Sequence, residues 1–124
     1  MLTFHALILG GEQATRASLS VAFDHACAML TRLPRMFIEP DGSFVWRGNS
    51  ADGRPWQVDG NLIDQGDVLA YVELHGCCPA EQFDLILAAL GWPEAKLVFQ
   101  LPRRGVFLAE GKFRRLAASA AGAV

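Results

Sequence analysis

The chain has 124 residues, 52% of them hydrophobic and 19% charged, and a formal net charge of −2. This composition predicts one globular domain over residues 1–117, followed by a flexible tail at 118–124. The negative charge argues against nucleic-acid binding, which needs a basic surface. Three cysteines are too few for a disulfide framework, so we expect reduced thiols and a cytoplasmic location.

The first predicted strand covers residues 2–9, where both alternating sets of side chains are largely apolar. Such a strand belongs in the middle of a sheet. Its apolar run is too short to span a bilayer and has no basic segment before it, so no membrane partner is expected. Gly10 and Gly11 are expected to end the strand. Without a fuller glycine motif they are only a weak indication of an anion site.

A long helix is predicted over residues 12–33, because apolar side chains recur there at helical spacing. The opposite side of this helix carries small and apolar residues, including Val21 and Ala28. That side suits contact with another helix, from the same chain or from a second copy. Pro34 is expected to end the helix.

Two hairpins follow, and the first covers residues 35–47. Its predicted turn is Pro40-Asp41-Gly42, a three-residue loop that places glycine at the position needing positive φ. This loop pairs Met36 with Trp46 on one face of the hairpin and Phe37 with Val45 on the other.

The second hairpin, residues 56–74, is predicted to turn at Asp64-Gln65-Gly66, which sets Trp56 opposite Leu74 and Val58 opposite Val72. One of its faces is apolar. The other face carries polar residues: Gln57, Asp59, Asn61, Tyr71 and Glu73, with His75 following them if the strand continues.

Three interpretations of this polar face stay open. It is a solvated sheet surface, or a ligand or partner surface with Tyr71 as its anchor, or an acid–base site in which Asp59 and Glu73 act as diagonal neighbours. The space over Gly60 and Ala70 is a possible seat for a small ligand.

His75-Gly76-Cys77-Cys78 is predicted to form an elbow between the last strand of this hairpin and a helix. A thiol near a helix N-terminus can have a lowered pKa, so Cys77 or Cys78 is a candidate nucleophile with His75 as its base. The alternatives are a partial metal site and small buried residues at a turn. Because paired cysteine spacing is absent elsewhere, we predict no metal and no cofactor.

The helix after the elbow should begin at Pro79, since proline suits the first helical position. Its apolar stripe is Phe83, Ile86, Leu87 and Leu90, and Leu85 lies off this stripe, which indicates a second contact. A strand over residues 96–101, a turn, a short returning strand and a helix over residues 109–117 complete the chain.

The predicted order is β-α-ββ-ββ-α-ββ-α. It indicates an α+β two-layer sandwich in which two main helices cover a mainly antiparallel sheet of five to seven strands. The order of the core elements resembles that of the small acidic dimeric chaperones of secretion systems. This resemblance covers element order alone, and it implies a chaperone-like, protein-binding role.

Charge is unevenly distributed along the chain. Residues 39–84 contain nine acids and two bases, a net charge of −7, whereas residues 96–115 contain six bases and one acid, a net charge of +5. Such polarity can steer a partner or favour self-association. Alternatively, the two segments neutralise each other within the fold.

These patterns favour a non-enzymatic protein-interaction module that acts as a homodimer. No established catalytic signature is present, while apolar residues off the main stripes could form an interface: Leu7, Val21, Ala28 and Leu85. The alternatives are a small enzyme that uses Cys77 or Cys78 and a small-ligand binder.

Overall fold

The computed structural model describes residues 1–12 and 15–122 of the chain. In chain order its elements are β1 (Leu2–Glu12), β2 (Thr15–Ala17), α1 (Phe23–Thr31), β3 (Met36–Ile38), β4 (Ser43–Asn49), β5 (Pro55–Gln65), β6 (Val68–Cys78), α2 (Ala80–Ala89), β7 (Leu97–Leu101), β8 (Val106–Ala109) and α3 (Glu110–Gly122). The strands form one antiparallel sheet in the order β3-β4-β5-β6-β1-β7-β8, with β2 paired to β1. The predicted α+β architecture and the central place of the first strand are confirmed.

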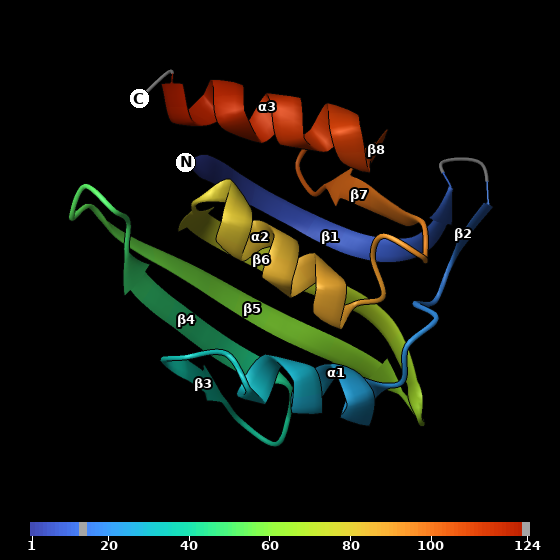
Figure 1. Ribbon diagram of the computed structural model, residues 1–124. Coiled ribbons are helices and arrows are strands. Elements are labelled where there is room, and N and C mark those ends of the chain that lie inside the picture. Colours follow the sequence, from blue (N-terminus) through green and yellow to red (C-terminus); the bar gives the residue numbers. More distant parts are fainter. Residues whose placement is uncertain (13–14, 123–124) are drawn as a thin grey trace.

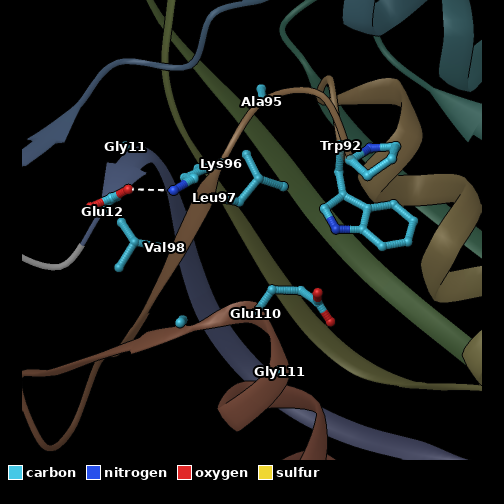
Figure 2. Close-up of a pocket in the computed structure, with 11 residues that line it drawn as sticks. Gly11, Glu12, Trp92, Ala95, Lys96, Leu97, Val98, Glu110 and Gly111 are labelled. Atoms are coloured by element: carbon cyan, nitrogen blue, oxygen red, sulfur yellow. Dashed lines mark hydrogen bonds and ion pairs between the residues drawn. The ribbon is translucent and has the colours of Figure 1, made fainter.

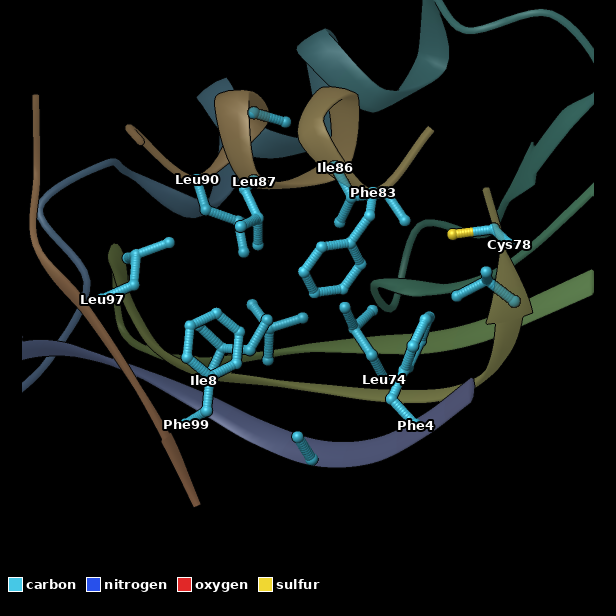
Figure 3. Close-up of a cluster of buried hydrophobic side chains, with 14 of the residues drawn as sticks. Phe4, Ile8, Leu74, Cys78, Phe83, Ile86, Leu87, Leu90, Leu97 and Phe99 are labelled. Atoms are coloured by element: carbon cyan, nitrogen blue, oxygen red, sulfur yellow. The ribbon is translucent and has the colours of Figure 1, made fainter. Parts of the chain in front are cut away.

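The helices lie on one face of the sheet (Figure 1). Buried residues of all three helices, Ala26, Phe83 and Phe113 among them, belong to one hydrophobic cluster together with the sheet. Figure 3 shows its centre, where the predicted stripe of α2 points at Phe4 and Phe99. Within the described part of the chain no polar or charged residue is buried, so this core is built from apolar side chains.

The register of the first hairpin is confirmed. Met36 lies opposite Trp46, Phe37 opposite Val45, and the backbone N–H of Glu39 donates to the carbonyl of Ser43 at 2.9 Å. The aromatic and β-branched residues of this hairpin are typical of half-buried strands. With a short loop, only one register keeps its apolar residues on the same face.

The predicted register of the second hairpin is wrong by four residues. Val58 lies opposite Gly76 instead of Val72, because the chain turns later, at Gly66-Asp67, and a register shift follows Ile63. An even shift leaves every side chain on its own face, so alternation could not distinguish the two pairings. The later turn lengthens both strands, and β6 then continues through the segment that was predicted to be an elbow.

The helix predicted over residues 12–33 is also wrong in its first half, where residues 13–14 lie outside the described part of the chain. β1 continues to Glu12, and β2 returns along it with Gly10 opposite Ala17. A methyl group on Gly10 would overlap the carbonyl of Ser18, so glycine allows this close return. Strand pairing satisfies the backbone N–H and C=O groups that hydrogen bonds within a helix would otherwise satisfy. Beyond β2, for example, the N–H of Leu19 donates to the carbonyl of Leu69 at 2.9 Å.

Two smaller boundaries differ from the prediction. Pro79 precedes α2 as its N-cap, in an extended conformation, and is not its first helical residue. α3 continues to Gly122, so residues 118–122, predicted as a flexible tail, are helical. Residues 123–124 of that tail lie outside the described part of the chain.

Candidate functional site

The face of the sheet that the helices leave uncovered carries most of the predicted site residues, and we name it the outer face. Its side chains across β3, β4, β5, β6 and β1 include Phe37, Ser43, Val45, Arg47, Gln57, Asp59, Asn61, Ile63, Tyr71, Glu73, His75, Cys77, Thr3, His5 and Leu7. Because the strand register aligns these residues, they form rows across the sheet. One row consists of Phe37, Val45, Asp59, His75 and His5.

Two histidines meet at the centre of the outer face. The rings of His5 and His75, on neighbouring strands, have their centroids 4.7 Å apart. Glu73 Oε2 lies 2.9 Å from Nε2 of His5, and Gln57 Nε2 donates to Asp59 Oδ1 at 3.1 Å. The polar residues predicted for this face thus come together, and the tertiary structure adds His5 to them.

Asp59 and Glu73 remain diagonal neighbours in the observed register, since Asp59 faces His75 and Glu73 faces Asn61. The side chains of His5 and Glu73 are 39% and 42% exposed, however, so water reaches the pair freely. Acid–base catalysts work best in sites that exclude water and shift the pKa. The geometry of this pair is therefore that of an open surface that water reaches.

The two adjacent cysteines lie on opposite faces of β6, because the segment is a strand and not an elbow. Burial raises the pKa of the Cys78 thiol to about 12, so this group stays protonated at neutral pH. Cys77 is half-buried on the outer face, which it shares with His75. Burial, and next the charge of Asp24, raise the pKa of Cys27 as well.

The other predicted interface residues do not form one surface. Leu7 belongs to the outer face, whereas Leu85, 45% exposed, lies on α2 on the other side of the molecule. Ala28 is on α1 and Val21 just before it, also on the helix side. The space predicted above Gly60 does not exist, because the ring of Phe44 fills it.

A cavity of about 560 Å³ lies between the start of β7 and the first turn of α3 (Figure 2). Lys96 Nζ is 2.6 Å from Glu12 Oε1 at its rim, and this hydrogen bond lowers the pKa of the Glu12 carboxyl. Trp92 and Glu110 form another part of its wall, and both contact Arg114: its guanidinium lies 5.1 Å from the Trp92 ring, and its Nε donates to Glu110 at 2.5 Å. The polar groups of this cavity therefore have partners within the chain.

The two oppositely charged segments lie on opposite sides of β1 in the sheet order. Among the described residues, one ion pair joins them, from Arg114 Nη2 to Asp84 Oδ1 at 2.7 Å, and it lacks hydrogen-bond geometry. Neutralisation within the fold is therefore limited to one contact between the segments. The remaining acids of residues 39–84 and bases of residues 96–115 therefore give the surface regions of opposite charge.

No protein-family model, curated protein or solved structure matches this chain. In the described ranges no helix is long and apolar enough to cross a membrane. The same residues contain no group of three or more histidine, cysteine, aspartate or glutamate side chains placed to hold a metal ion.

Proposed function

We propose that this protein is a non-enzymatic binding module that acts as a homodimer, with the outer face of the sheet as the interface between its two copies. The observation that carries the proposal is the asymmetry of the sheet, which has its helices on one face and a mixed apolar and polar surface on the other. A free thiol set of Cys27, Cys77 and Cys78 fits a reducing compartment, and we propose the cytoplasm.

The size of the outer face supports a dimer of moderate affinity. Strands about 4.8 Å apart, with residues that rise about 3.3 Å each, give the outer face over β3, β4, β5, β6 and β1 an area of roughly 700 Å². A standard interface uses about 800 Å² from each partner. The outer face is therefore large enough for a reversible dimer and small for a permanent one.

The composition of the face supports the same conclusion. Phe37 is 66% exposed, and half-buried Val45, Tyr71 and Leu7 lie among charged and polar neighbours. Interfaces between proteins that also exist apart have this mixed character, whereas permanent dimers have a more apolar interface. Tyr71 supplies a ring with a polar end, which is a frequent anchor in such interfaces.

The charges of the outer face are arranged to meet a copy of themselves. Asp59 lies beside His75, and Glu73 lies beside His5. In a dimer whose twofold axis passes through this cluster, the acids of one copy can meet the imidazoles of the other. The homodimer is therefore the occupant that the face fits best.

The test is the oligomeric state of matched variants, measured by sedimentation velocity over roughly 1–200 μM, the range expected for an interface of this size. We expect the wild type to dimerise with rising concentration and a Phe37→Ser/Tyr71→Ser variant to stay monomeric. Leu85→Ser, which removes an exposed apolar side chain from the helix side, is the control and should dimerise like the wild type. A monomeric wild type, or equal loss of the dimer in the control, would contradict the proposal.

The structure favours one second candidate, a thiol enzyme built on Cys77. Asp59 lies directly opposite His75, and Cys77 is on the same face two residues further along β6. A cysteine, a histidine and an orienting carboxylate are the groups that thiol catalysis requires. Cys78 takes no part in this candidate, because it lies on the covered face with a raised pKa.

A further inference from the structure

A second cavity, of about 400 Å³, opens at the edge of β1. β7 pairs with β1 only from Leu7 to Gly10, so the part of β1 before Leu7 extends past the end of β7. α3 and the turn between β7 and β8 occupy the space beside this free edge. The cavity therefore continues around the edge of the sheet, from the side of α3 to the outer face.

One wall of this cavity is apolar. It consists of Phe4 from β1, Leu101 at the end of β7, and Phe113 and Leu116 from α3. The ring of Phe113 is held by the core, since its centroid lies 4.5 Å from that of Phe99 in a stacked arrangement. Leu116 is 38% exposed at the opening. This wall is a preformed surface for a hydrocarbon group.

The remaining wall is rich in nitrogen bases. Arg103 and Arg104, both exposed, lie in the turn between β7 and β8, and His5 and His75 lie across from them on the outer face. No aspartate or glutamate is among the described residues that line the cavity, although the chain has 13 acids. Glu73 contacts His5 from outside the cavity and takes up one of its ring nitrogens. Two guanidinium groups and His75 are left to face a ligand.

From this geometry we propose that the cavity binds an apolar molecule through its carboxylate, with Arg103 and Arg104 as the carboxylate-binding groups. Guanidinium groups bind carboxylates in a planar, two-point manner, and the volume lies within the range of ligand sites. Two sources offer this chemistry: a free aliphatic carboxylic acid, and the C-terminal carboxylate of a polypeptide that ends in an apolar residue. The inference goes beyond the proposed dimer, and His5 and His75 belong both to the lining of this cavity and to the proposed interface.

Binding is tested by isothermal titration calorimetry with octanoate, with octanol as the uncharged analogue. Octanoate is expected to bind at least tenfold more tightly than octanol. An Arg103→Gln/Arg104→Gln variant should lose at least tenfold in affinity for octanoate. The matched control is Lys112→Gln/Arg115→Gln, which removes the same charge from the neighbouring helix without touching the cavity lining, and it should stay within twofold of the wild type.

Three further measurements complete the test. Leu116→Trp fills the opening and should abolish octanoate binding while the circular dichroism spectrum and melting temperature stay close to those of the wild type. Phe37→Ser removes no residue of the cavity lining, so its monomer should bind octanoate at least as tightly as the wild type does. A short peptide ending in leucine, with a free or an amidated C-terminus, identifies the source: tighter binding of the free peptide than of octanoate points to a polypeptide end, and the reverse to a free acid.

Equal binding of octanoate and octanol would overturn the inference, as would an equal loss in the Lys112→Gln/Arg115→Gln control. So would the failure of both octanoate and the free peptide to bind. A wild type that stays monomeric yet binds octanoate through the two arginines would overturn the dimer alone.

Discussion

The two faces of one sheet differ in what covers them, and adjacent residues of β6 show the consequence. Cys78 is fully buried against α2, and its pKa is raised to about 12, whereas Cys77, next to it, is half-buried on the outer face. Phenylalanines show the same contrast, because Phe83 is completely buried and Phe37 is 66% exposed. Stability thus resides on the covered face, which leaves the outer face free to serve recognition.

The largest effect expected from this comparison is that of Phe83→Ala. The Phe83 ring lies 5.1 Å from Phe4 and 6.1 Å from Phe113, so its removal leaves a cavity where α2, α3 and β1 meet. We expect a loss of about 3–5 kcal/mol in the free energy of unfolding, which denaturant titration measures.

The control for Phe83→Ala is Phe37→Ala, the same chemical change on the outer face. It should alter the unfolding free energy of the monomer by no more than about 0.5 kcal/mol. Comparable losses in the two variants, measured at concentrations below dimerisation, would show that the outer face also contributes to the core.

A smaller effect concerns alkaline pH. The pKa of Cys78 is raised from 9.0 to about 12 in the folded protein, so the unfolded chain releases this proton first as pH rises. The corresponding stability is fully present below pH 9 and is lost between pH 9 and 12. At about 1.4 kcal/mol per pH unit, the wild type should lose about 2 kcal/mol by pH 10.5.

Urea denaturation at pH 7.5 and 10.5 under reducing conditions measures this loss, with Cys78→Ala as the comparison. Other groups that titrate in this range are common to both proteins, so the difference in slope isolates Cys78. Parallel slopes would mean that the thiol gains no protection from the covered face.

The smallest effect distinguishes the binding module from the thiol enzyme. At pH 7 iodoacetamide should modify Cys77, whereas its reaction with Cys78 should be at least about 100-fold slower than its reaction with free cysteine. Peptide mass spectrometry measures both rates. If the outer face serves binding, His75→Ala should change the rate at Cys77 by less than about twofold. A tenfold decrease in that variant would favour the enzyme, since it would show His75 acting as a base for the thiol.

The two hairpins show how far local patterns predict this structure. The pairing of Met36 with Trp46 was predictable, because a short loop and a dense apolar set left one register. Val58 was assigned to Val72 and pairs with Gly76, since two registers kept the same faces and the turn at Gly66-Asp67 selected the longer one. Residues 15–17 show the opposite limit, because a spacing that suits a helix was overridden there by pairing with β1.

The candidate site was likewise predictable only in part. Gln57, Asp59, Tyr71, Glu73 and His75 were predicted on one face from alternation alone, and the outer face contains them all. The contact of His5 with His75 and the arginines of the second cavity were not predictable, because they require the place of β1 in the sheet.

The sequence by itself determined which face of the two hairpins each residue occupies, where α2 lies, and that the fold is an antiparallel α+β sandwich. The period at which apolar residues recur, two in a strand and 3.6 in a helix, is a local property of the sequence. Because one face must be buried, this period fixes which side chains point to the core. Only the tertiary structure decided that β1 lies between β6 and β7, and thereby that His5 meets His75 and that a cavity opens past the end of β7. The physical reason is that strand order depends on pairing between segments about 70 residues apart, which no local period encodes.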